Sequence, residues 1–203
     1  MPRTILILDA ASPLGRATAV RLGRAGWNVV LGGASMSGLK AVCAELPDHA
    51  TMPVRLDATD PDNLAPVLAQ AEARFGALDA VLFNNRARAQ GWKRSLHAEV
   101  AALAATADLC APLLERSAGR FVIAGRRAGG RSMDSAVATV TRDAVRTIAD
   151  ALDADWLGAP CNVTLVEPRE VTTPRDMARR IARVLNGATP ETSRSDSGAV
   201  AAG

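Results

Sequence analysis

Short apolar runs rich in isoleucine, valine and leucine alternate along this chain with longer stretches of helical period. The longer stretches are rich in alanine, leucine and arginine, and apolar residues recur in them every three or four positions. This alternation is typical of βαβ units, in which a parallel sheet is buried between two layers of helices. We therefore predict an α/β fold: a doubly wound parallel sheet in a three-layer αβα arrangement.

Six strands and six helices follow from the same pattern. The predicted strands are Thr4–Leu8, Val29–Leu31, Met52–Leu56, Ala80–Phe83, Arg120–Ile123 and Asn162–Val166. The predicted helices are Leu14–Arg24, Gly38–Glu45, Pro61–Phe75, Lys93–Arg116, Ser135–Trp156 and Arg175–Leu185. Turn residues separate these elements, among them Gly23, Gly26 and the pair Ala118-Gly119.

The length of 203 residues allows one domain with a substantial core. We place that domain at residues 1–186. The remaining stretch, 187–203, is small, polar and without periodicity, so we expect a flexible C-terminal tail.

Composition excludes several classes of function. A net charge of +3 is only mildly basic, and no aromatic stacking platform accompanies it, so we expect no nucleic-acid partner. The three cysteines are widely spaced and lie in no metal-ligand pattern. We therefore predict that they are small core residues, and we expect no metal. No run of about 18 apolar residues and no secretory signal is apparent, so we expect no membrane association and a cytoplasmic location.

The chain contains no tyrosine. A mechanism that needs a phenol as its acid or base is therefore excluded before any motif is considered.

Six segments, in order and spacing, resemble the landmarks of the short-chain dehydrogenase/reductase family. They cover almost the whole chain: ILILDAASPLGRATAVRLGRAGWNVVLGG, LDATDPDNL, FGALDAVLFNNRA, SAGRFVIAGRRAGG, RDAVRTIADALDADW and NVTLVEPREVTTP. The resemblance implies a Rossmann-like fold and descent from NAD(P)-dependent oxidoreductases. Function has to be argued from the sites themselves.

The phosphate-binding loop departs from the family pattern TGxxxGxG. Gly15 is the one glycine of that pattern present here, while Asp9 and Pro13 occupy the positions of the other two. Asp9 brings negative charge toward an anionic pyrophosphate, and Pro13 removes a donor N–H. Both changes oppose dinucleotide binding, and the loop can equally be a plain turn from strand to helix.

Two further residues resemble parts of the family's cofactor site. Asp57 matches the residue that contacts the adenine ring, and Asn84 matches the first asparagine of NNAG. Each also has a structural reading, Asp57 as a helix cap and Asn84 as a tie between strand ends. The segment 32–35 offers neither the acid nor the arginine that selects between cofactors. We therefore expect no cofactor, with Gly15, Asp57 and Asn84 as a residual site and NAD(P) as the alternative.

The family's catalytic tetrad of Asn, Ser, Tyr and Lys is changed at every position. Alignment without gaps places Glu99, Arg126, Ala138 and Arg142 there. The lid segment that precedes the last helix in the family is also missing after Pro174.

Arginines follow several of the predicted strands. This group is Arg86, Arg88, Arg126, Arg127, Arg131, Arg169 and Arg175. Guanidinium groups suit carboxylate or phosphate, so an anionic ligand or an acidic partner is one hypothesis for this crevice. Ordinary solvated loop charge is the other.

These observations lead us to predict a catalytically inactive protein that acts as a non-catalytic subunit or binding module. By the resemblance, it would associate through its two long helices, as a homodimer or with an active dehydrogenase of the same family. The first alternative is an NAD(P)-dependent oxidoreductase with an unconventional active site, with Glu99 or Asp9 as acid or base. The second is anion binding at the arginine-rich crevice.

Overall fold

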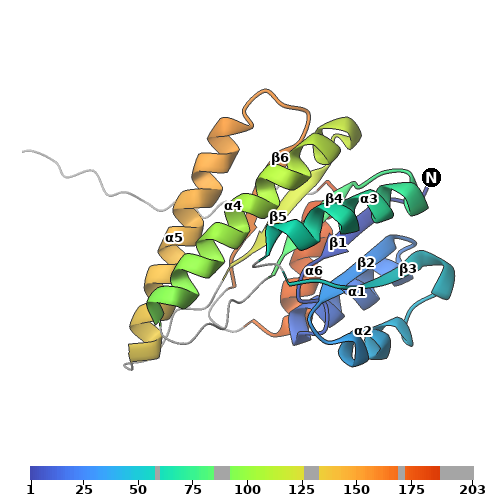
Figure 1. The fold of residues 1–203 in the computed structure, drawn as a ribbon, viewed down its shortest axis with the longest axis horizontal. Helices are drawn as coiled ribbons and strands as arrows, with labels where there is room; N and C mark the ends of the chain where they lie inside the picture. The colour runs from blue at the N-terminus through green and yellow to red at the C-terminus, as the bar shows by residue number, and fades with distance from the viewer. Residues whose placement is uncertain (58–59, 85–91, 126–132, 169–171, 188–203) are drawn as a thin grey trace, which may run out of the picture.

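A computed structural model describes residues 1–57, 60–84, 92–125, 133–168 and 172–187. Strands and helices alternate along the chain, as the sequence predicts (Figure 1). The predicted tail beyond residue 187 lies outside the described residues.

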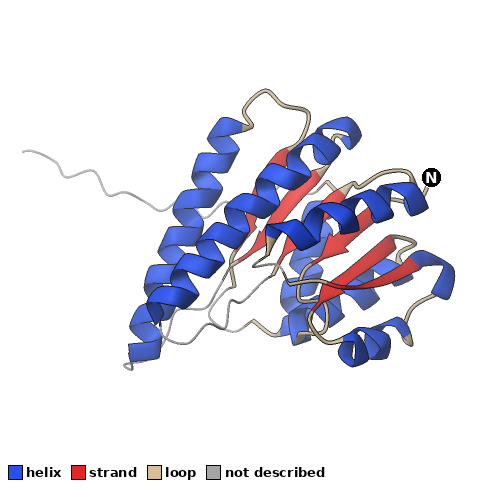
Figure 2. Ribbon diagram, viewed as in Figure 1, coloured by secondary structure: helices blue, strands red, loops and turns tan. Residues whose placement is uncertain are grey.

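The six described strands form one parallel sheet in the order β3-β2-β1-β4-β5-β6. The strands are β1 (Thr4–Ile7), β2 (Asn28–Gly33), β3 (Thr51–Arg55), β4 (Ala80–Phe83), β5 (Arg120–Ala124) and β6 (Asn162–Val166). Helices cover both faces of this sheet (Figure 2). The predicted class, a doubly wound α/β domain of three layers, is confirmed.

Helices occur where the helical period predicted them. They are α1 (Pro13–Arg24), α2 (Met36–Cys43), α3 (Leu64–Phe75), α4 (Trp92–Ser117), α5 (Met133–Asp155) and α6 (Pro174–Leu185), with short 3₁₀ turns at Asp48–Ala50 and Pro61–Asn63. Every start differs from prediction by one to three residues, and two of these differences have a visible cause. Helix α2 begins earlier because Ser35 caps it, accepting the N–H of Gly38. Helix α3 begins only at Leu64, since the 3₁₀ turn occupies the preceding residues.

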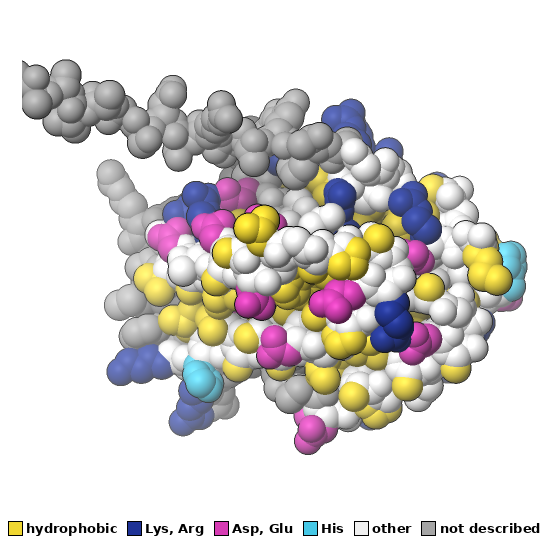
Figure 3. Space-filling view, turned by 90° about the horizontal axis from the view of Figure 1, so that it is seen from above, with side chains coloured by type: hydrophobic (Ala, Val, Ile, Leu, Met, Phe, Trp, Pro, Cys, Tyr) yellow, Lys and Arg dark blue, Asp and Glu magenta, His cyan; other side chains and the backbone are white. Residues whose placement is uncertain are grey.

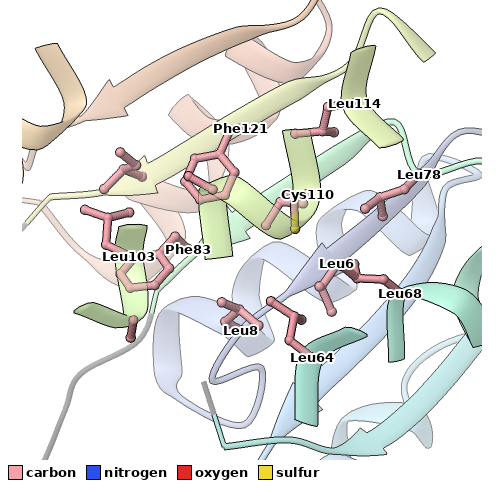
Figure 4. Packing of buried hydrophobic residues seen from close by; sticks show 14 of the residues in the cluster. Leu6, Leu8, Leu64, Leu68, Leu78, Phe83, Leu103, Cys110, Leu114 and Phe121 are labelled. Atoms are coloured by element: carbon pink, nitrogen blue, oxygen red, sulfur yellow. The ribbon is translucent and has the colours of Figure 1, made fainter. Parts of the chain in front are cut away.

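Alternate residues of each strand face opposite layers, which divides the core in two. On one face, Leu6 of β1 and Leu8 just after this strand pack with α3, α4 and α5 (Figure 4). On the other face, Ile5 and Ile7 pack with α1, α2 and α6. Phe121 is fully buried in the first cluster, where its ring stacks on Phe83 at 6.5 Å between centroids.

Helix α4 is, by length and composition alone, long and apolar enough to cross a membrane. In this structure Leu103, Ala107, Cys110 and Leu114 of α4 are fully buried in the first core cluster. Packing on the sheet thus buries part of this helix, about 33% of its most apolar stretch.

Candidate functional site

The strand order reverses between β1 and β4, which are neighbours in the sheet although far apart in sequence. In open α/β sheets, ligands bind outside the carboxyl ends of the strands at such a point. The turn from β1 to α1 and the end of β4 border this crevice, so the site residues are described from here outward.

The β1–α1 turn is tightly packed. Asp9 has φ of 50°, in the left-handed region that glycine adopts most easily and aspartate tolerates. A Cβ on Gly15 would lie 2.4 Å from the Asp9 carbonyl oxygen and 2.7 Å from Ala10 Cα. Position 15 therefore requires glycine, because the start of α1 lies directly against the backbone of the turn.

Ser12 connects this turn to β4. Its Oγ caps α1 by accepting the Gly15 N–H at 3.2 Å, and it accepts the Asn84 Nδ2–H at 2.8 Å. Asn84 is 5% exposed. It therefore ties the end of β4 to the N-cap of α1, whereas its structural reading predicted a tie between strand ends. The sequence analysis missed Ser12, although a serine directly before a proline at the first helical position is a recognisable capping signal.

The end of β2 carries small neutral groups. Ser35 caps α2, its Oγ lies 3.1 Å from Ser37 Oγ, and both serines are exposed. Lys40 is also exposed, one turn further along α2. No acidic residue occurs between β2 and the end of α2. Sequence reasoning did not single out these hydroxyls.

Asp57 lies after β3 and is exposed. Its predicted alternative role was to cap the next helix. In the structure the carboxylate that accepts the Asp62 N–H and an Asn63 side-chain N–H in this turn is that of Asp60. The N-cap of α3 is Asn63. Asp60 is therefore the cap shown at this turn, and the capping role of Asp57 stays a prediction.

Three of the four tetrad positions can be described, and they lie on two helices. Glu99 is on α4 and is 3% exposed. Ala138 and Arg142 are one turn apart on α5, each half-buried. The Arg142 guanidinium donates to the carboxylate of the next residue, Asp143, through Nε at 3.0 Å and through a terminal nitrogen at 2.9 Å. Arg126 lies outside the described residues.

Six of the seven arginines expected at the crevice also lie outside the described part of the chain. The exception is Arg175, which is exposed on the first turn of α6. Residues 167–173 separate β6 from α6, and the predicted loss of the family's lid segment stays a prediction.

The cysteines are poor nucleophiles. Burial raises the pKa of the Cys110 thiol to about 12, and burial also raises the pKa of Cys43 and of Cys161. No group of three histidine, cysteine or acidic side chains that could hold a metal occurs among the described residues.

A family model described as short chain dehydrogenase matches residues 3–183. The chain belongs to this family. The predicted resemblance is thereby confirmed over nearly its whole length.

Similar proteins carry oxidoreductase names. An uncharacterized oxidoreductase of Myxococcus xanthus is 29% identical over 179 residues, covering 82% of this chain and 71% of the relative. An uncharacterized oxidoreductase of Staphylococcus aureus is 25% identical over 184 residues, covering 84% and 79%. A metagenomic short-chain oxidoreductase in complex with NADP superimposes with a TM-score of 0.80 at 19% identity, covering 90% of each chain.

These comparisons correct one prediction and leave another without support. The expectation of a catalytically inactive subunit or binding module is wrong, because the family is one of dehydrogenases and the relatives that span four-fifths of the chain are oxidoreductases. The expectation that no cofactor binds has no support from the family match. The first error came from treating changed side chains at the motif positions as sufficient evidence of lost function.

Proposed function

We propose that this chain is an NAD(P)-dependent oxidoreductase that interconverts a carbonyl and an alcohol with an unconventional set of acid and base residues. The observation that carries this proposal is the β1–α1 turn. Gly15, Ser12 and Asn84 hold the start of α1 against the sheet at the point where the strand order reverses.

The residues of this turn fit a dinucleotide pyrophosphate. The first turn of α1 contains no acidic residue, so the positive end of its dipole meets no carboxylate within the helix. Pro13 occupies the first helical position, where the N–H that it lacks has no partner within the helix. Asp9 is the acidic residue of the turn. Its negative charge lowers the affinity for the pyrophosphate but does not prevent binding.

The end of β2 supports NADP over NAD. Enzymes of this fold that prefer NAD place a carboxylate here to accept hydrogen bonds from the ribose hydroxyls. This chain has Ser35 and Ser37 instead, at the N-terminus of α2, with Lys40 nearby. Hydroxyl groups, a helix N-terminus and an ammonium group favour a 2′-phosphate.

When bound, the nicotinamide supplies or accepts the hydride. The chain's own contribution is the proton at the substrate oxygen. With no tyrosine in the sequence, we assign this role to the carboxyl of Glu99, a side chain shielded from water in the second turn of α4. Arg142 would then supply the positive charge that the family places at this position with lysine.

The experiment measures NADPH oxidation with a panel of aldehydes and ketones. Glu99→Gln removes the ionisable group with little change in shape, and we expect kcat to fall by about 10²–10⁴-fold. Glu115→Gln is the matched control, because Glu115 is an exposed residue of the same helix. Equal rates for Glu99→Gln and the wild type would refute only the role assigned to Glu99, and not the proposed oxidoreductase activity. Absence of NADPH and NADH oxidation with every carbonyl would refute the proposed function.

A further inference from the structure

A groove of about 1340 Å³ runs between α1 and α6 on the outer surface of one helical layer. It begins beside the crevice, at Pro13 and Thr173, and extends away from it to Ala25 along one helix and to Asn186 along the other. Small apolar residues such as Ala17, Val20 and Ala178 line it. The charged lining consists of one glutamate, Glu45, and six arginines: Arg16, Arg21, Arg24, Arg175, Arg179 and Arg183.

Most of this charge has no counter-charge nearby. Arg16 pairs with Glu45 at 2.7 Å and Arg179 pairs with Asp176 at 3.2 Å. The other four groove arginines are exposed and have no ion-pair partner among the residues that the structure describes. Together α1 and α6 contain seven arginines and one aspartate. Such a surface attracts an anionic partner and repels another basic surface.

The C-terminal end of α5 has the opposite character. Asp150, Asp153 and Asp155 are exposed, and the last turn of this helix contains no basic residue. The helix dipole disfavours carboxylates at a helix C-terminus, and a nearby cation would offset this unfavourable interaction. Figure 3 shows acidic side chains beside hydrophobic ones on the face of the molecule that is seen from above.

An apolar strip accompanies these aspartates. Leu157, just after the end of α5, is 87% exposed, and Ala151 and Ala154 are exposed on the preceding turns. The α5 end, defined as Asp150–Leu157, therefore presents small apolar residues and one leucine between carboxylates.

We propose that the α5 end of one copy of this chain docks in the α1–α6 groove of a second copy. The aspartates would meet the arginines at the rims, in the geometry that suits bidentate guanidinium–carboxylate contacts. Leu157 and the alanines would cover the apolar floor, as in recognition of an amphipathic helix by a groove. The lengths agree, because twelve-residue helices bound a groove of about 18 Å and the α5 end spans roughly 12 Å.

The two surfaces belong to opposite layers of the sheet. Helices α1 and α6 pack in one core cluster, and α5 packs in the other. One copy cannot fill its own groove, so the contact is head-to-tail and leads to rings or open chains of copies. The apolar floor favours this occupant over inorganic phosphate or a nucleic-acid backbone, which would need polar donors there.

Sedimentation velocity over a range of protein concentrations tests the proposal. We expect the mean mass to rise with concentration at about 0.05 M NaCl, and this rise to disappear at about 0.5 M. Association through the long helices, predicted from the sequence, would persist in high salt because it is apolar. The quantity to follow is therefore the part of the increase in mean mass that disappears in high salt.

Charge reversal locates the contact. Arg21→Glu with Arg183→Glu, or Asp150→Lys with Asp153→Lys, should each weaken the salt-sensitive association by at least about tenfold, and the four changes together should restore it. Leu157→Ser should weaken it without any change of charge. Arg94→Glu, an exposed arginine of α4 outside both surfaces, is the control, and circular dichroism checks folding.

Three results would overturn the proposal. The first is a wild-type mass that does not depend on salt. The second is a salt-sensitive association that either double variant leaves unchanged, or that the fourfold variant fails to restore although it folds. The third is thermal stabilisation by inorganic phosphate that disappears in the Arg21/Arg183 variant while association persists, because the groove would then hold a small anion.

Discussion

The two sides of the crevice differ in how firmly the fold holds their polar residues. On the side of the β1–α1 turn, two hydrogen bonds link Ser12 to Gly15 and to Asn84. Gly15 also lies so close to the backbone of the turn that a Cβ atom would collide with it. On the side of α4 and α5, Arg142 pairs only with its sequence neighbour Asp143 among the interactions described, and Ala138 is half-buried.

This difference separates two kinds of site residue. In the β1–α1 turn the residues that would hold a cofactor are also needed for packing, so changing them damages the fold. The positions on α5 contribute little to the core, so the side chain there can change without loss of structure. The fold thus constrains the cofactor side of the crevice more tightly than the two site positions on α5, Ala138 and Arg142.

The largest effect should come from Gly15→Ala. The new Cβ would collide with the backbone of Asp9 and Ala10, which cannot move aside without opening the turn, so we expect a loss of about 3 kcal/mol in the free energy of unfolding. Gly23→Ala in the same helix is the control. There the Cβ would meet the Leu46 Cδ2 atom, the far end of a flexible side chain. Urea unfolding measures both, and equal losses would contradict a backbone constraint specific to position 15.

Asn84→Ala should cost about 2 kcal/mol, because it removes a buried donor from Ser12. Ser12→Ala should cost about 1 kcal/mol through the lost helix cap. Since both changes remove the same contact, the double variant should lose less than the two single losses together. If the losses in the free energy of unfolding are strictly additive, the hydrogen bond between β4 and the turn contributes nothing to stability.

A smaller effect is expected from Asp9→Asn, measured as NADPH affinity. Asparagine tolerates the left-handed backbone at this position and removes the charge, so the Kd should fall about tenfold. The same change at the exposed Asp60 is the control, since its carboxylate caps a turn elsewhere. A Kd that Asp9→Asn leaves the same or raises would refute an electrostatic penalty at the turn.

The smallest effect should be that of Arg142→Ala on stability. The pair with Asp143 is partly exposed, with 32% and 59% of the two side chains accessible, so we expect a change within about 0.5 kcal/mol. Thermal unfolding measures this directly. A loss comparable to that of Asn84→Ala would show that the α5 side is as constrained as the turn, and would remove the contrast between the two sides.

Much of the fold could be predicted from the sequence because each strand is a short apolar run bounded by turn residues. The strand at Asn162–Val166 is predicted to the residue, and most other boundaries are correct within one or two positions. The α2 start was missed because a single serine cap decides it. Departures from the family motif predicted a lost function, and the family match and the oxidoreductase relatives contradict this prediction.

The arrangement of the turn shows most clearly why the site was only partly predictable. Gly15 and Asn84 could be found from their motif positions. Ser12 joins them across 72 residues of sequence, and nothing in the local pattern indicates that its hydroxyl meets Asn84.

The central claim is that the turn still binds a dinucleotide, and fluorescence titration of the purified chain with NADPH and NADH tests it most directly. We predict saturable binding that is tighter for NADPH, and that Asp9→Asn strengthens. A chain that is folded by circular dichroism and shows no saturable change with either dinucleotide would contradict the account.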